Sequence, residues 1–159
     1  MDASVLLKRA EKKLSGLHPV VAEKARQLIK KACAEGIPII ITQGLRTIEE
    51  QNRLYAQGRT KPGKIVTNAR GGYSYHNFGL AFDVCVCDVV KGNLVPNWKV
   101  DRRWHRVGQI GKSLGLEWGG DWRRFKDYPH FQYTFGLTLA QLRSGKKPPI
   151  VNVAKREKR

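Results

Sequence analysis

The strongest constraint on the fold is residues 80–90, LAFDVCVCDVV, where two aspartates are the only breaks in a run of apolar side chains. The length of this run and its β-branched valines favour a strand at the centre of a sheet. Lys91-Gly92-Asn93 is a turn signal, so we expect the chain to return as a second strand over residues 93–99. Any fold for this chain must provide neighbours and cover for the central strand.

Short helices and strands flank this strand without the regular β-α-β alternation of a parallel sheet. Apolar residues at helical spacing predict two N-terminal helices, and Thr47 and Glu50 form a capping box for a third. We therefore predict an α+β fold, with a small central, mostly antiparallel sheet and helices packed on it. The expected helices are 2–14, 19–34, 48–57, 102–114 and 137–143, the other strands are 38–42 and 129–134, and the long loops are 58–75 and 117–127.

The chain length and the termini predict one domain with a short tail. A chain of 159 residues suits a single domain, which we place at residues 1–145. Residues 146–159 are basic and contain proline, and we expect a flexible tail there. The N-terminal residues lack the apolar core of a signal peptide, and no run of 18 apolar residues occurs. We therefore expect synthesis in the cytoplasm and no membrane span.

The cysteines are consistent with that compartment. Cys33, Cys85 and Cys87 are too few, and odd in number, for a disulfide framework, which suits a reducing cytoplasm. Cys85 and Cys87 lie two residues apart in the central strand, and we interpret them as small buried apolar side chains. A C-x-C metal site is the alternative, although no second cysteine pair supports it. Cys85 shares a strand face with Asp83, so its contact with a site there stays open.

The charge balance predicts attraction to an anionic partner. Lysine and arginine number 30 against 13 for aspartate and glutamate, which gives a formal net charge of +17. Such a chain is attracted to nucleic acid, anionic lipid or an anionic cell wall, although charge also serves solubility alone. The charge thus indicates the sign of a partner and not its identity.

Two histidines and an aspartate are spaced so that one metal ion can bind all three. His76 and Asp83 lie seven residues apart across a turn at Gly79, and His130 lies on a separate predicted strand. Because neighbouring strands run about 4.8 Å apart, these side chains can converge. Catalytic zinc takes three histidine or carboxylate ligands and leaves a fourth position for water. For either histidine alone, a hydrogen-bonded structural role is the simpler interpretation.

Asp127 and Arg46 are placed to assist chemistry at such a metal. Asp127 precedes His130 by three residues, where a carboxylate can move a proton from water to a leaving amine. Arg46 follows the strand predicted at 38–42, where a guanidinium can stabilise an oxyanion or bind a substrate carboxylate. Each also has a plainer interpretation, as a solvated loop acid and as one of many surface arginines.

These motifs together resemble the VanY-like family of zinc D-alanyl-D-alanine carboxypeptidases, dipeptidases and L-alanyl-D-glutamate endopeptidases. The resemblance extends from about Pro38 to Tyr133, and residues 43–59 and 117–122 look most like the endopeptidase branch, which includes phage endolysins and bacterial autolysins. The family pattern S-x-H-x-x-G-x-A-x-D is matched by Ser74, His76, Gly79, Ala81 and Asp83, and its (D/E)-x-x-H by Asp127 and His130.

The resemblance implies a role for each matched residue. His76, Asp83 and His130 match the ligands of Zn²⁺, which would lie at the sheet face, and Asp127 matches the general base. The same resemblance gives catalytic and substrate-binding roles to Arg46 and a substrate-binding role to Ser74. No wall-binding module follows residue 145, so targeting by such a module is in doubt.

We therefore expect a zinc metallopeptidase that cleaves the L-Ala–D-Glu bond of the peptidoglycan stem peptide. A D,D-carboxypeptidase or dipeptidase releasing D-Ala is the alternative on the same metal site. A basic nucleic-acid-binding protein is a third hypothesis, although no zinc-finger or RNA-binding signature supports it, and we expect no specific nucleic acid. A metal-binding wall module without catalysis is disfavoured, since it has no use for Asp127. We expect a monomer that acts on the cell wall, reaching it through a holin pore in a phage-infected host.

Overall fold

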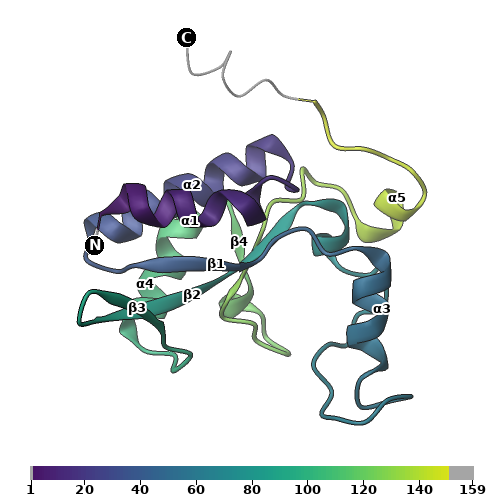
Figure 1. The fold of residues 1–159 in the computed structure, drawn as a ribbon. Coiled ribbons are helices and arrows are strands. Elements are labelled where there is room, and N and C mark those ends of the chain that lie inside the picture. Colours follow the sequence, from purple (N-terminus) through teal and green to yellow (C-terminus); the bar gives the residue numbers. More distant parts are fainter. Residues whose placement is uncertain (1, 151–159) are drawn as a thin grey trace.

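The computed structural model describes residues 2–150, and it confirms the α+β prediction with an antiparallel sheet at the centre. The five strands are β1 (Ile39–Gln43), β2 (Ala81–Val90), β3 (Asn93–Pro96), β4 (Glu117–Trp118) and β5 (His130–Gln132). Their order is β1-β2-β5-β4, and β3 pairs with the outer half of β2. The predicted central strand is β2, the longest of the five, and it pairs with β1 and with β5. Figure 1 shows β2 beside β1 and β3.

The helices lie at the positions that the apolar periodicity and the capping signals predict. They are α1 (Ala3–Leu14), α2 (Pro19–Ala34), α3 (Ile48–Ala56), α4 (Arg102–Ser113) and α5 (Leu139–Arg143), with short 3₁₀ helices η1 (Tyr75–Phe78) and η2 (Gly119–Asp121). Thr47 and Glu50 form both hydrogen bonds of the predicted capping box at α3. Gly36 and Gly115, with φ of 78° and 89°, follow α2 and α4 in the left-handed conformation that glycine accepts without strain.

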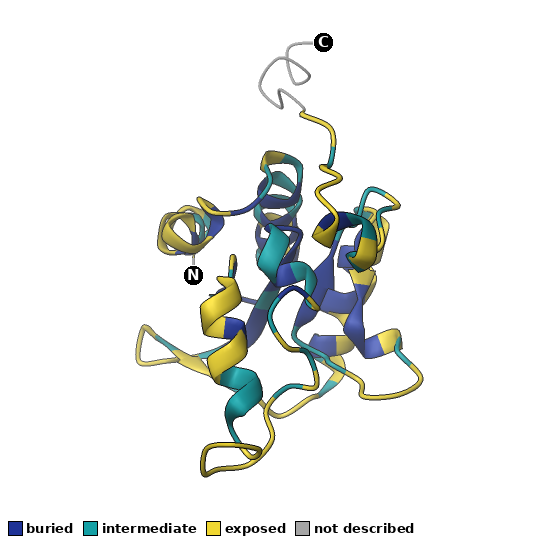
Figure 2. Ribbon diagram, turned by 90° about the vertical axis from the view of Figure 1, so that its right-hand side faces the viewer, coloured by how far each residue is buried: buried dark blue, intermediate teal, exposed yellow. Residues whose placement is uncertain are grey.

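One apolar core joins the sheet to α1, α2 and α4, and Leu142 of α5 also belongs to it. Helices α1 and α2 pack against β1, and α4 packs between α2 and β4 (Figure 1). The buried residues of these elements form one apolar cluster, and Figure 2 shows the buried residues, in dark blue, in the sheet and in the helices beside it. Phe82 and Phe131 stack at the centre of the sheet with ring centroids 5.7 Å apart. This core holds β2 and β5 rigidly, and both strands carry candidate site residues.

Helix α3 and the loop after it project from the end of the sheet instead of packing on it (Figure 1). Gln51 is the one buried residue of this helix. The next segment, residues 57–74, forms an extended loop, apart from an isolated bridge between Gln57 and Lys61. It confirms the loop predicted over 58–75, except that η1 already begins at Tyr75. The site described below lies between this projecting part and the sheet.

The sequence-based boundaries need small corrections. Strand β4 lies inside the segment predicted as a loop over 117–127, because its two residues become a strand only by pairing with Gln132 and Phe131 of β5. The returning strand ends at Pro96 and not at 99, since its pairing with β2 ends at Cys87. The predicted tail begins within the described residues, where the Pro149 carbonyl accepts a hydrogen bond from His18 Nε2 at 2.8 Å. Residues 151–159 of that tail lie outside the described residues. Within residues 2–150, no helix is long and apolar enough to cross a bilayer.

Candidate metal centre

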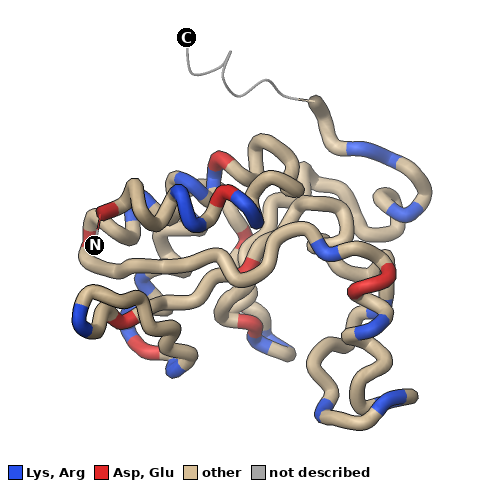
Figure 3. Tube along the Cα trace, viewed as in Figure 1, with Lys and Arg blue, Asp and Glu red and all other residues tan. Residues whose placement is uncertain are grey.

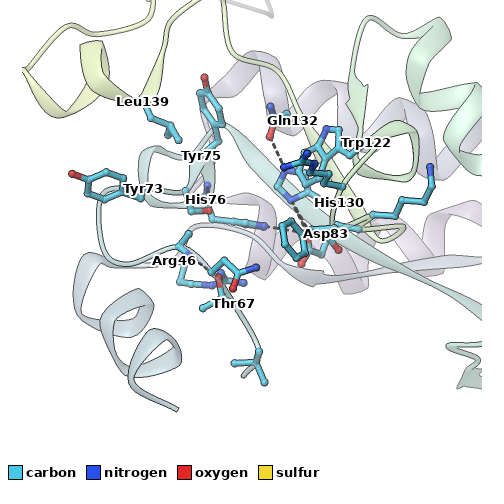
Figure 4. Close-up of a pocket in the computed structure, with 18 residues that line it drawn as sticks. Arg46, Thr67, Tyr73, Tyr75, His76, Asp83, Trp122, His130, Gln132 and Leu139 are labelled. Atoms are coloured by element: carbon cyan, nitrogen blue, oxygen red, sulfur yellow. Dashed lines mark hydrogen bonds and ion pairs between the residues drawn. The ribbon is translucent and has the colours of Figure 1, made fainter. Parts of the chain in front are cut away.

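The side chains of His76, Asp83 and His130 meet at one point on the sheet. Their ligand atoms all lie within 4.8 Å of one another. Asp83 Oδ1 is 3.0 Å from His76 Nε2 and 3.3 Å from His130 Nδ1, as the dashed lines in Figure 4 indicate. Both imidazoles are buried, with 4% and 6% of the side chain exposed, whereas Asp83 is 18% exposed. The cluster is therefore held by the core and open on one side.

Strand register and one tight turn produce this convergence. Asp83 of β2 is paired directly with His130 of β5, so their side chains emerge side by side on one face of the sheet. His76 lies on η1, which ends at Gly79 with φ of 70°. A Cβ at Gly79 would lie 3.1 Å from the Gly16 carbonyl oxygen, so glycine satisfies both the backbone conformation and the close approach. The turn lets η1 fold back over the start of β2.

Hydrogen bonds from the outer nitrogens fix the tautomer of both histidines. His76 Nδ1 lies 2.9 Å from the Gly44 carbonyl oxygen, which only accepts, so Nδ1 carries the proton and Nε2 is bare. Gln132 Nε2 donates to a Glu117 carboxylate oxygen at 2.8 Å, which turns Gln132 Oε1 toward His130. His130 Nε2 then donates to this oxygen at 2.7 Å, leaving Nδ1 bare.

Two bare imidazole nitrogens thus face a single carboxylate oxygen, Asp83 Oδ1. Three acceptors pointing at one another are stable only around a cation or an added proton. With protons alone, burial raises the pKa of Asp83, but hydrogen bonds from His130 and His76 outweigh burial and hold it well below its usual value. Burial disfavours the charged form of His130 as well and so lowers its pKa. The hydrogen bond with Asp83 outweighs burial and raises the pKa of His130. Two histidines and one carboxylate with an open side are a donor set that fits Zn²⁺.

Asp127 lies beside the cluster without joining it. Its Oδ2 is 3.9 Å from His130 Nδ1, and 45% of its side chain is exposed. Burial raises the pKa of the Asp127 carboxyl, and the negative charge of Asp83 raises it further. The backbone of Asp127 is anchored by hydrogen bonds with Gly119 and His130. A carboxyl group with a raised pKa therefore lies at the edge of the cluster of candidate metal ligands.

Arg46 approaches the cluster from the end of β1. Its backbone N–H donates to the His76 carbonyl at 3.0 Å, and its Nη1 donates to Gln51 Oε1 at 2.9 Å. Its Nε is buried and has no hydrogen-bond partner among the described residues. Ser74 caps η1, where its Oγ accepts the His76 N–H at 3.2 Å. Both residues are therefore tied to the segment that carries His76.

An open cavity of about 810 Å³ brings all six predicted site residues together. Figure 4 shows it between the loop after α3 and the segment that precedes β5. The walls are formed by Arg46, Val66, Thr67, Asn68, Ala69, Tyr73, Ser74, Tyr75, His76, Asp83, Trp122, Arg124, Phe125, Lys126, Asp127, His130, Gln132 and Leu139. A cavity of this size accommodates a peptide segment next to His76, Asp83 and His130.

Similarity to known proteins decides the family. A family model described as D-alanyl-D-alanine carboxypeptidase matches residues 67–133, which include every cluster residue and Asp127. The peptidoglycan L-alanyl-D-glutamate endopeptidase CwlK of Bacillus subtilis is 48% identical over 124 residues, covering 74% of each chain. The chain belongs to the peptidase family that this model describes and that includes CwlK. It is accordingly a hydrolase of the metallopeptidase type.

A further relative and two solved structures are also similar to this chain. The L-alanyl-D-glutamate peptidase of a Listeria phage is 33% identical over 113 residues, which are 70% of this chain and 36% of that protein. The structure of the Serratia marcescens L-Ala D-Glu endopeptidase ChiX superposes with a TM-score of 0.58 at 27% identity, covering 80% of this chain and 87% of that one. The D,D-pentapeptidase VanY, solved in complex with Zn(II), shares the fold with a TM-score of 0.54 at 18% identity, covering 74% and 72% of the two chains.

Three supporting residues of this peptidase were missed by the sequence analysis. Gln132 and Glu117 orient His130, and Gln51 orients Arg46. Two sequence signals were available: Gln132 is two residues after His130 and so shares its strand face, and Gln51 is a polar residue on the first turns of a short amphipathic helix. Neither signal reveals which side chain the glutamine contacts, because these contacts depend on strand pairing and on the loop after α3.

The cysteines lie outside the cluster. Cys85 is fully buried, and its Sγ donates weakly to the Val86 carbonyl oxygen at 3.3 Å. The metal-ligand grouping found within residues 2–150 contains no sulfur. Cys85 and Cys87 are therefore buried apolar side chains, as predicted, and nothing in this region resembles a C-x-C metal site.

Proposed function

We propose that this peptidase is a zinc-dependent peptidoglycan hydrolase that cleaves the L-Ala–D-Glu bond of the stem peptide. The convergence of two bare imidazole nitrogens and a carboxylate oxygen at the wall of an open cavity supports the zinc assignment most directly. The 48% identity to CwlK, an endopeptidase of this specificity, supports the choice of bond.

The six predicted site residues in the cavity then have defined tasks. Zn²⁺ held by His76, Asp83 and His130 would polarise the scissile carbonyl and make the attacking water more acidic. Asp127 accepts the proton of that water and returns it to the leaving amine, because its carboxylate lies beside the cluster and forms no salt bridge with a lysine or arginine among residues 2–150. Arg46 stabilises the negative charge that develops on the carbonyl oxygen.

The surroundings of Arg46 suit that task. Gln51 accepts a hydrogen bond from Nη1 of the guanidinium and so fixes its orientation. The Arg46 side chain also lines the cavity, so its other terminal N–H groups can donate to a substrate oxygen there. Ser74 lies on the same wall and contributes to substrate binding.

The charge and the relatives of this peptidase support the proposal that it acts on the cell wall. The net charge of +17 favours adhesion to anionic polymers of the cell wall, and lysine and arginine are spread over α1, α2, α3 and the region of α5 (Figure 3). The similarity to a phage peptidase supports release from the host cytoplasm through a holin pore. One polypeptide supplies every residue of the proposed site, so a monomer suffices.

Digestion of purified cell walls tests the proposal. We expect the zinc-loaded protein to release fragments with a new N-terminal D-Glu, and a chelator to stop the release. Free D-Ala would instead identify a D,D-carboxypeptidase or dipeptidase. Intact wall peptides, together with a salt-sensitive DNA band shift that survives chelation, would favour the nucleic-acid hypothesis. Gel filtration tests the monomer, and binding to walls with and without teichoic acid tests adhesion.

A further inference from the structure

A cationic corner, formed by Arg70 and Arg143 around the wall residue Tyr73, adjoins one end of the cavity and has no role in the mechanism above. Figure 4 shows Tyr73 and Leu139 at this end and Trp122 at the other, with His76 between them. The Tyr73 ring has the guanidinium carbon of Arg143 3.8 Å from its centroid and that of Arg70 4.5 Å away. Two arginines from distant parts of the chain therefore converge on one wall residue of the cavity.

Direct hydrogen bonds hold both guanidiniums in place. Arg70 Nη2 donates to the Tyr73 hydroxyl at 3.0 Å, and Arg143 Nη1 donates to the Gly72 carbonyl at 3.1 Å. Each guanidinium carries five N–H donors, and these contacts use only a small part of them. Arg70 and Arg143 are exposed, and Tyr73 is 39% exposed, so the remaining donors are open to a ligand.

No acidic side chain balances these two charges. Arg70 and Arg143 form no salt bridge within the described residues 2–150. Residues 51–82 contain five lysines and arginines and not one aspartate or glutamate, and residues 128–150 likewise lack acids. The hydrogen bond from Arg70, and next the charge of Arg143, lower the pKa of Tyr73, which reflects a positive potential at this corner. An anion placed here would relieve the repulsion between two neighbouring cations.

We propose that Arg70 and Arg143, positioned by Tyr73, form a carboxylate-binding subsite for the stem peptide. The inference rests on the proposed function, because it assumes a peptide lying along the cavity. Arg46 is bonded to the backbone of the zinc ligand His76 and serves the scissile bond, whereas Tyr73 lies farther along the wall. The subsite therefore takes a carboxylate beyond the scissile bond, such as the side-chain carboxylate of diaminopimelate at the third position.

Paired substrates test this subsite. One is the tetrapeptide L-Ala-γ-D-Glu-diaminopimelate-D-Ala with a blocked N-terminus, and the other carries an amide in place of the diaminopimelate side-chain carboxylate. For Arg70→Gln and Arg143→Gln, we expect kcat/KM on the carboxylate substrate to fall about tenfold, the effect of one charge-assisted hydrogen bond at a partly exposed site. On the amide substrate, both variants should have the same kcat/KM as the unsubstituted protein. Arg53→Gln, which removes an exposed charge on α3 away from Tyr73, is the matched control and should change neither rate.

The ratio between the two substrates separates binding from folding. Loss of folded protein lowers the cleavage rates of both substrates equally. An equal loss on both substrates would therefore overturn the subsite, and it would show that the two arginines hold the loop against α5. Unchanged rates with both variants would overturn it as well. If the unsubstituted protein cleaves neither peptide between L-Ala and D-Glu, the proposed function fails and the subsite falls with it.

Discussion

Replacing Gln132 by methionine should weaken zinc binding without removing any ligand. The change keeps the size of the side chain but removes the oxygen that accepts the His130 Nε2 proton at 2.7 Å. His130 and Gln132 are 5% and 7% exposed, so water does not readily replace this acceptor. The imidazole then gains by moving its proton to Nδ1, where it can donate to Asp83 Oδ1, 3.3 Å away. A proton on Nδ1 competes directly with the metal.

The size of the effect follows from the lost hydrogen bond. Leaving a buried donor without an acceptor costs about 1–3 kcal/mol, and outer hydrogen-bond partners of metal ligands typically change affinity by roughly 10- to 100-fold. We therefore expect zinc affinity to fall by about that factor, as measured by competition with a chromophoric chelator. Thermal unfolding of the metal-free variant should stay close to that of the metal-free unsubstituted protein, because the proton that moves to His130 Nδ1 finds a new acceptor in Asp83 Oδ1.

Glu117→Gln is the matched control for this relay. A glutamine at 117 retains an oxygen that can accept from Gln132 Nε2, so the orientation of Gln132 persists and zinc affinity should change by less than about threefold. A Gln132→Met protein that binds zinc within about twofold of the unsubstituted protein would refute the assignment of the His130 tautomer. A Glu117→Gln protein as weak as Gln132→Met would show that the carboxylate charge, and not amide orientation, supports the site.

Three further outcomes follow from the site and the core. His76→Ala should lose both zinc and wall hydrolysis, whereas Asp127→Ala should keep its zinc, measured by metal analysis, and lose about 10²- to 10⁴-fold in kcat; an active Asp127→Ala protein would remove Asp127 from proton transfer. Phe131→Ala should lower the free energy of unfolding by about 3–5 kcal/mol in urea denaturation, because the ring is fully buried against Phe82. Burial raises the pKa of the Cys85 thiol to about 11, so at pH 8 it stays protonated and should react with Ellman's reagent only after unfolding.

Much of the secondary structure could be predicted because its signals are local. The helical spacing of Leu6, Ala10 and Leu14 in α1 and the Thr47–Glu50 capping box each lie within one element, and each appears as expected. Strand β4 could not be predicted in this way. Its two residues, Glu117 and Trp118, form a strand only because β5 lies beside them. Propensity over two residues carries too little information to identify such a strand.

The candidate site divides in the same manner. The ligand types were visible in the sequence, since His76, Asp83, Asp127 and His130 fall in two short motifs. The partners that orient them were not visible. Gly44 lies 32 residues before His76, and its carbonyl oxygen reaches the imidazole only because β1 and η1 are adjacent in space.

The sequence by itself determined which side chains are available to bind a metal, where the helices and the longer strands lie, and how strongly the chain is charged. The tertiary structure alone decided that Asp83 and His130 are paired across β2 and β5, that both imidazoles turn a bare nitrogen to one oxygen, and that Arg70 and Arg143 meet at Tyr73. The physical reason is strand register. Moving β5 by one residue would turn His130 to the opposite face of the sheet, and burial of the whole core, not any local preference, fixes that register.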